Sequence, residues 1–313
     1  MSMFTSAMAD SIAAFIEFKH AMGVDFKDGE YILRRFDAFA DKTGATVLNR
    51  PTVEGFICDH DRTGSDRHHL SCLRGFARFL QANGHDAHVI SSAATSSTVR
   101  PATYLLSTAE IEAFFTTAVT TKLPDPWGWQ ASAFFGLMFA CGLRTCEARR
   151  LNRTDIHYGD GVIDILWSKG PRSRRLPVSS EVVEMLANCD RENECFAPGR
   201  KPLFISGARN PLNAKAPAVM FRRIWQAADL SIPLGKPKPV PYALRHHFAY
   251  ANIERWAAGG VDPQAMLPYL ARYMGHTDVS STYYYMHLSP DYAATYVNAA
   301  HASQGLIPDV SDE

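Results

Sequence analysis

Apolar residues recur at helical spacing through roughly the first ninety residues of the chain. They predict helices around residues 12–16, around residues 32–39, after Pro51, and over residues 73–80, with the last one stopping at Gly84. No segment here alternates apolar and polar residues as a half-buried strand does. This part of the sequence therefore predicts a small helical bundle.

A segment of small polar residues without periodicity follows at residues 91–103. Such a composition is typical of a linker. We therefore expect a helical domain over residues 1–92, a linker over 93–103, and a second domain over 104–313 that ends in a C-terminal tail. No internal repeat is visible in the sequence.

The second domain combines helical and strand patterns. A capping box at Ser107 opens a helix, residues 131–140 predict a buried helix, and another helix follows Gly142. The β-prone run 162–167 and residues 176–178 predict two strands joined by a polar turn. Helical patterns return afterwards, so the expected fold class is mainly α with a small β-sheet.

The composition is that of an ordinary globular protein. The chain has 313 residues, 46% of them hydrophobic and 20% charged, which excludes a largely disordered or collagen-like chain. Its most apolar stretch, residues 127–143, contains Gln130 and falls short of a membrane span. The N-terminus lacks the basic start of a secretory signal. The six cysteines form no CxxC pair, so we expect reduced thiols, no metal site and a cytoplasmic location.

Charge is balanced over the whole chain but not locally. The 32 basic and 32 acidic residues give a net charge of zero, which by itself argues against a nucleic-acid partner. Residues 144–175, however, hold eight basic and four acidic residues, and residues 200–245 hold nine basic and one acidic residue. Because phosphate contacts dominate protein–DNA affinity, these two windows predict a DNA face with salt-dependent binding.

Five short motifs carry candidate chemistry. They are Gly-Leu-Arg-x-x-Glu at 142–147, Lys-Gly at 169–170, Leu-Arg-His at 244–246, Gly-His at 275–276, and three tyrosines at 283–285. Each motif alone has an ordinary structural explanation, such as a solvated arginine, a hairpin turn or a packed tyrosine. No glycine-rich phosphate loop, metal-ligand pattern or nucleophile elbow is present in the sequence.

The order and spacing of these motifs resemble the tyrosine recombinase (phage integrase) family over about residues 105–290. The strongest part is the segment 274–287, which is similar to that family's Leu-Gly-His segment and the nucleophile after it. Its spacing selects Tyr285 rather than Tyr283 or Tyr284.

The resemblance implies a helical core-binding (SAM-like) domain followed by an α+β catalytic domain. It implies site-specific cutting and rejoining of double-stranded DNA through a 3′-phosphotyrosyl intermediate, by a tetramer that serves a mobile element and associates with the nucleoid when bound. This chemistry requires no metal or nucleotide cofactor. The need for an accessory protein stays open.

The residue types suit attack on a phosphodiester. Arg144 and Arg245 carry planar, permanently charged donors that match a phosphate, and His276 can add a hydrogen bond. Tyr285 supplies a phenol, and we expect its pKa, ordinarily about 10, to fall beside the two arginines. Lys169 resembles the family's general acid, which protonates the leaving 5′ oxygen.

One position departs from the family pattern. The residue three before the second arginine is usually histidine, and here it is Tyr242. Tyr242 is a candidate catalytic residue whose hydroxyl can donate a hydrogen bond to phosphate, but it is a poor proton carrier near neutral pH. His246 or His247 could compensate, or both could simply pack. His246 is a supporting candidate, as are His287 and Glu147, and we expect Glu147 to orient its neighbours.

Basic residues in the two charged windows and on the last helix of the first domain are the candidate DNA contacts. On that helix a solvated face is an equal alternative. The candidates are Arg74, Arg78, Arg149, Arg172, Arg174, Arg175, Arg222, Arg223, Lys236 and Lys238.

Two further expectations concern the C-terminal part of the chain. The glycine-containing stretch 257–260, between Arg245 and His276, suggests a longer loop than the shortest members of that family have. Residues 292–300 can form a helix that packs on its own subunit or on a neighbouring protomer. Two other interpretations of the whole chain stay open. One is a DNA-binding protein of the same fold with impaired strand exchange, favoured by Tyr242. The other is a topoisomerase-like nicking and closing enzyme.

Overall fold

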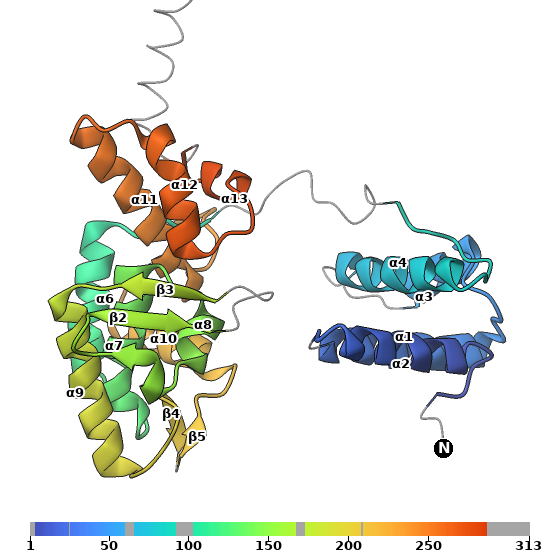
Figure 1. Cartoon of the computed structure of the whole chain (residues 1–313), viewed down its shortest axis with the longest axis horizontal. Coiled ribbons are helices and arrows are strands. Elements are labelled where there is room, and N and C mark those ends of the chain that lie inside the picture. Colours follow the sequence, from blue (N-terminus) through green and yellow to red (C-terminus); the bar gives the residue numbers. More distant parts are fainter. Residues whose placement is uncertain are drawn as a thin grey trace, which may run out of the picture. The chain divides into compact units, whose positions relative to one another are not determined.

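The computed structural model describes residues 4–24, 26–59, 66–91, 103–166, 173–207 and 209–286. The chain divides into two units, Met1–Pro101 and Ala102–Glu313 (Figure 1). The point of division lies within the segment for which a linker is predicted. Lys169, Arg172, His287 and the helix predicted at 292–300 lie outside the described residues.

The regular secondary structure described in the first unit is all helical. Its helices are α1 (Ala9–Ala21), α2 (Lys27–Thr43), α3 (Arg50–Cys58) and α4 (Asp66–Ala82). Their apolar faces meet in a phenylalanine core, where the ring centres of Phe15 and Phe76 lie 5.5 Å apart and those of Phe36 and Phe56 lie 5.4 Å apart. Each helix presents an apolar stripe to this core, which is why the helical spacing was visible in the sequence.

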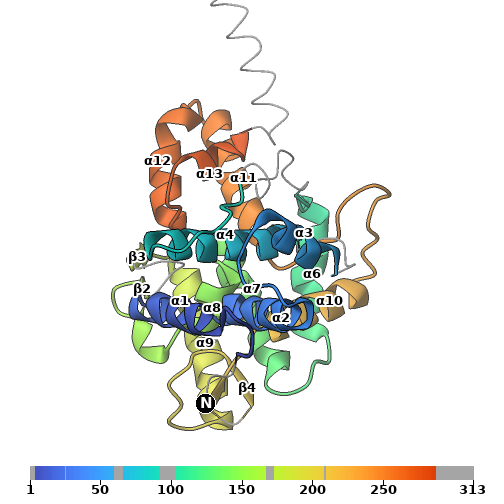
Figure 2. The same cartoon turned by 90° about the vertical axis from the view of Figure 1, so that its right-hand side faces the viewer.

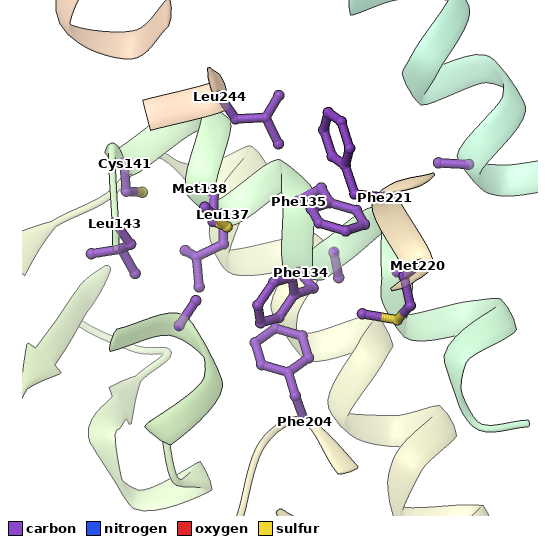
Figure 3. Close-up of a cluster of buried hydrophobic side chains, with 14 of the residues drawn as sticks. Phe134, Phe135, Leu137, Met138, Cys141, Leu143, Phe204, Met220, Phe221 and Leu244 are labelled. Carbon is purple, nitrogen blue, oxygen red and sulfur yellow. The ribbon is translucent and has the colours of Figure 1, made fainter. Parts of the chain in front are cut away.

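The second unit is built around α7 (Trp127–Cys141), most of whose side chains are buried. Phe134 of this helix packs on Phe204 with ring centres 5.1 Å apart, and Leu143 and Leu244 are fully buried in the same core (Figure 3). Each of these two leucines precedes an arginine of the sequence motifs. Burial of the leucines therefore fixes the backbone from which both arginines project.

A small antiparallel sheet covers part of this unit. Its strands run in the order β1 (Ile156–His157), β2 (Val162–Ile165) and β3 (Arg174–Pro177), and Asp164 of β2 pairs with Arg175 of β3. Strand β2 ends two residues earlier than predicted and β3 begins two residues earlier. A second sheet, β4 (Ile205–Gly207) with β5 (Asn210–Pro211), was not predicted because its strands are too short to show alternation.

The remaining helices of the described second unit surround α7 or lie beyond it. They are α6 (Thr108–Thr120), α8 (Thr145–Arg150), the 3₁₀ turn η1 (Arg153–Asp155), α9 (Ser180–Phe196), α10 (Ala216–Ala227), α11 (Tyr242–Ala258), α12 (Pro263–Met274) and α13 (Ser280–Tyr283). Both views place α11, α12 and α13 together at one end of this unit (Figures 1 and 2).

The interval between Arg245 and His276, in which a loop is predicted, is mostly helical. Helices α11 and α12 fill this interval, and a turn of residues 259–262 joins them. The two glycines that suggested a loop end α11, while the apolar residues of α12 face the small core shared with α11. Within the described part of the chain, no helix has the length and apolar character needed to cross a membrane.

Candidate active site

Arg144 lies where the chain turns sharply from α7 into α8. Gly142 adopts a φ of +59°, and a Cβ here would lie 2.4 Å from Cδ1 of Phe248, so this turn requires glycine. The backbone N–H of Arg144 donates to Oε2 of Glu147 at 2.9 Å, which closes the first turn of α8. The motif Gly-Leu-Arg-x-x-Glu therefore encodes a sharp turn and a helix start that bring an arginine and a glutamate together.

Glu147 is a buried carboxylate on which three arginines converge. Its Oε1 accepts from Nη1 of Arg144 at 2.7 Å and from Nη1 of Arg174 at 3.0 Å, and its Oε2 accepts from Nη2 of Arg174 at 2.9 Å. Nη1 of Arg245 lies 3.9 Å from Oε2. The Glu147 side chain is only 1% exposed. One carboxylate thus offsets guanidinium groups that would otherwise repel one another.

Arg245 lies in the first turn of α11 and is fully buried. Its guanidinium donates to the carbonyl oxygens of Gly142 and Met274, the latter at 3.0 Å. Burial lowers the pKa of Arg245, but a guanidinium stays charged in proteins. Among the described residues, the Arg245 Nε–H has no hydrogen-bond partner. A buried charged donor of this kind is suited to an anionic oxygen.

Replacing Glu147 with glutamine is expected to lower the free energy of unfolding by about 3–5 kcal/mol, because it removes the counter-charge of the buried Arg245 and of Arg174. Urea unfolding followed by circular dichroism measures the loss. The matched control is Glu184→Gln on the exposed face of α9, for which a change within about 0.5 kcal/mol is expected. An equal loss in both variants would contradict the bridging role of Glu147.

His276 follows the glycine that ends α12. Gly275 has a φ of +70°, and its carbonyl accepts a hydrogen bond from Nη2 of Arg144 at 2.7 Å. Nδ1 of His276 lies 2.6 Å from Oγ1 of the buried Thr282. Burial, and to a smaller extent the nearby charges of Arg245 and Arg144, lower the pKa of His276 to about 4. The imidazole is therefore neutral at physiological pH.

Of the three consecutive tyrosines, Tyr285 is the one whose side chain contacts His276 and His246. Its side chain is buried, its ring stacks on that of His276 with centres 6.4 Å apart, and its hydroxyl lies 3.0 Å from Nδ1 of His246. By contrast, Tyr283 is 45% exposed, and the hydroxyl of Tyr284 lies 2.9 Å from Oγ1 of Thr103.

The expected fall in the pKa of Tyr285 is wrong for the chain without DNA. Burial raises this pKa, and the nearby phenol of Tyr242 raises it further, while Arg245 and Arg144 lower it by less. Desolvation of the phenolate therefore outweighs the attraction of the two arginines. The phenol stays protonated in the resting site.

Tyr242 and His246 lie one turn apart on the same face of α11. Their ring centres are 4.7 Å apart and the rings meet edge to face. The guanidinium carbon of Arg245 lies 5.9 Å from the centre of the Tyr242 ring. His247 points elsewhere and stacks on Phe139 with ring centres 5.4 Å apart. Of the two histidines considered as substitutes, His246 therefore contacts the site and His247 packs.

Several candidate DNA contacts bond to other parts of the protein. Arg149 donates to the carbonyl of Leu212 at 3.0 Å. Arg174, with 11% of its side chain exposed, belongs to the Glu147 cluster rather than to the surface. Arg175 pairs with Asp164 at 2.9 Å, although it stays 68% exposed.

The other described candidates differ in exposure. Arg74 is half-buried on α4 and is engaged in interactions of its own. The exposed candidates are Arg78, Arg222, Arg223, Lys236 and Lys238.

A groove of about 680 Å³ opens beside His276, between β3 and α12. Arg174, Arg175 and Arg272 line it together with Gly275 and His276. The sequence argument missed Arg272, because this residue lies outside both basic windows and only the packing of α12 against β3 brings it here. The groove therefore presents positive charge next to the candidate site.

Comparisons with known proteins show which proteins this chain is similar to. The sequence model described as the phage integrase family matches residues 105–291. An integrase/recombinase of Sinorhizobium fredii, y4rE, is 26% identical over 97% of this chain and 99% of its own length. Tyrosine recombinase XerC of Xylella fastidiosa strain 9a5c is 26% identical over 95% of this chain and 97% of its own.

Two solved structures share the fold. The integrase of the Tn1549 transposon, in complex with transposon right end DNA, has a TM-score of 0.65 at 18% identity and covers 92% of this chain and 98% of its own. The XerH site-specific recombinase in a post-cleavage complex with difH has a TM-score of 0.63 at 16% identity. The match covers 89% of this chain and 79% of the XerH chain. The mainly α fold class with small sheets is confirmed.

Proposed function

Because this chain belongs to the phage integrase family of tyrosine recombinases, we propose that it cuts and rejoins DNA strands through a 3′-phosphotyrosyl intermediate on Tyr285. The observation that carries the proposal is the meeting of Arg144, Arg245, His276 and Tyr285 at one end of the second unit. These residues come from four separate segments. Arg144 donates a hydrogen bond to Glu147, Arg245 lies at ion-pair distance from the same carboxylate, and the rings of His276 and Tyr285 stack.

The two arginines and His276 suit the stabilisation of a phosphorane-like transition state. Guanidinium N–H groups place positive charge where the non-bridging oxygens gain negative charge. If Thr282 donates its hydroxyl hydrogen to Nδ1 of His276 across their 2.6 Å contact, the Nε2–H of the neutral imidazole is left to donate to the phosphate. Arg144 keeps 17% of its side chain exposed and Arg245 keeps none, so the side of Arg144 is the open side of the site.

The covalent step balances without an external energy source. The oxygen of Tyr285 forms a bond to phosphorus as its hydroxyl proton passes to a base. The bond from phosphorus to the 5′ oxygen breaks, and the leaving oxygen takes a proton from Lys169. Attack by a 5′ hydroxyl on the phosphotyrosine reverses the step and joins the strands. The phosphodiester bond energy is kept in the enzyme–DNA linkage.

A nicked duplex that traps the covalent complex tests this function. A duplex that binds the purified chain is first selected from a randomised pool. Versions of this duplex are then made, each with a single nick at a different position. A nick just beyond the cleaved phosphate releases a short fragment and prevents rejoining. We expect a protein–DNA adduct that survives denaturing electrophoresis. Binding without an adduct at every nick position would refute strand cleavage and support the interpretation as a DNA-binding protein.

Arg272 is proposed as a phosphate contact in the groove beside His276. The salt dependence of binding to the intact selected duplex tests this contact. Removing one phosphate contact reduces the slope of log Kd against log salt by about one, so we expect this change for Arg272→Ala. Arg191→Ala, which removes an exposed charge on α9, is the control and is expected to keep the wild-type slope. Equal slopes for wild type and Arg272→Ala would show that Arg272 does not contact a DNA phosphate.

Three further parts of the proposal concern partners and biological role. Double-stranded DNA carrying a recombination site is the partner, two such duplexes are held by a tetramer of this chain, and the reaction serves a mobile element. The integrase/recombinase description of the relative from Sinorhizobium fredii supports the last part. Repeats that flank the gene at the ends of a mobile segment would be the corresponding genomic observation.

A further inference from the structure

The phenol of Tyr285 needs a proton acceptor inside the protein. The side chain is 3% exposed, and burial raises its pKa, so bulk water is a poor acceptor for its proton. Proton removal makes the oxygen a stronger nucleophile toward phosphorus. The family pattern has a histidine where this chain has Tyr242, and a second phenol cannot accept a proton near neutral pH.

His246 occupies the place where such an acceptor has to be. Its Nδ1 lies 3.0 Å from the Tyr285 hydroxyl oxygen, which is hydrogen-bond distance for direct proton transfer. The His246 ring is held between two aromatic neighbours: Tyr242 at 4.7 Å and Tyr285 at 5.5 Å between ring centres. Because His246 and Tyr242 are four residues apart on α11, they share one helix face.

The protonation state of His246 also allows it to accept a proton from Tyr285. Burial, and to a smaller extent the positive charge of Arg245, lower its pKa to about 4. The ring is therefore neutral at physiological pH and has one unprotonated nitrogen. In the tautomer that carries its hydrogen on Nε2, Nδ1 accepts the hydrogen bond from Tyr285. The negative charge of an incoming phosphate stabilises the imidazolium that forms on transfer.

We propose that His246 is a catalytic residue that takes the proton of Tyr285 during attack on the phosphate, and that Tyr242 is a positioning residue whose ring holds His246. In this step the O–H bond of Tyr285 breaks as an N–H bond forms on Nδ1 of His246. The freed electron pair forms the bond to phosphorus. On rejoining, His246 returns the proton to the departing tyrosine oxygen. The inference rests on the proposed function.

The test compares the rates at which variants form the covalent adduct on the selected nicked duplex. His246→Ala and His246→Asn are expected to slow adduct formation about 100-fold or more, the usual contribution of a general base. The asparagine variant keeps a polar group near Nδ1 but cannot carry a proton. His247→Asn, the same change at the neighbouring residue that packs on Phe139, is the matched control and is expected to react at the wild-type rate. Gel shifts with the intact duplex and melting temperatures show that each variant folds and binds DNA.

Chemical rescue separates a proton-transfer role from a structural one. Added imidazole is expected to restore adduct formation to His246→Ala, with substituted imidazoles acting in the order of their basicity, and to leave Tyr285→Phe inactive. Wild-type rates in both His246 variants would overturn the inference. The inference would also be overturned if His246→Ala folds and binds DNA normally but no imidazole restores its adduct formation. A wild-type chain that forms no adduct would instead overturn the proposed function itself, before any variant is compared.

Discussion

Replacement of Tyr285 by phenylalanine is expected to abolish covalent attachment to DNA while leaving the fold intact. The variant keeps the ring that stacks on His276 and loses only the hydroxyl that bonds to His246. Loss of one hydrogen bond lowers the free energy of unfolding by about 1 kcal/mol, whereas loss of the nucleophile leaves no oxygen to attack phosphorus. Adduct formation on the nicked duplex, followed by denaturing electrophoresis, measures the effect.

Tyr283→Phe is the matched control for this variant, because it makes the same change two residues earlier on a side chain that is 45% exposed. It is expected to form the adduct at the wild-type rate. An adduct in Tyr285→Phe, or its loss in Tyr283→Phe alone, would show that the nucleophile has been misassigned.

Replacement of Arg245 by lysine is expected to slow cleavage about 100- to 1000-fold, the usual cost of removing one preorganised transition-state donor. Lysine keeps the positive charge but has no planar fork. Its three N–H donors all project from one nitrogen, so they do not reproduce the separate positions of Nη1, Nη2 and Nε, of which the first two bond to the carbonyls of Gly142 and Met274 and the third is left for the phosphate. The single-turnover rate of adduct formation measures the loss.

Arg255→Lys makes the same change at an exposed position further along α11 and is expected to leave the rate unchanged. Comparing the two variants at a temperature where both are folded separates chemistry from stability. Cleavage by Arg245→Lys at the rate of Arg255→Lys would mean that the buried guanidinium serves the fold and not the reaction.

The sequence revealed those parts of the site that depend on local spacing. The glycines at 142 and 275 each end a helix in a left-handed turn, and each is followed closely by a site residue, Arg144 or His276. The distance from His276 to Tyr285 along the chain singled out one tyrosine of three. Such features are short-range and do not depend on how distant segments pack.

Contacts between distant segments could not be predicted in this way. Arg174 enters the Glu147 cluster because the register of β2 with β3 turns it inward, whereas its charge alone suggested a DNA contact. The sequence left both His246 and His247 as possible replacements for the missing histidine. The packing of α11 places His246 against Tyr242, one turn earlier, and near the hydroxyl of Tyr285. The raised pKa of Tyr285 depends on burial, which the number of nearby arginines does not show.

The most direct test of the central claim is to identify the residue that becomes linked to DNA. The adduct formed by the wild-type chain on the nicked duplex is digested with nuclease and trypsin, and the peptide that begins at Tyr273 is fragmented in a mass spectrometer. We predict a nucleotide joined through its 3′ phosphate to Tyr285. A nucleotide on Tyr283, on Tyr284 or on a serine, or a cleaved duplex with no linked peptide, would contradict the claim.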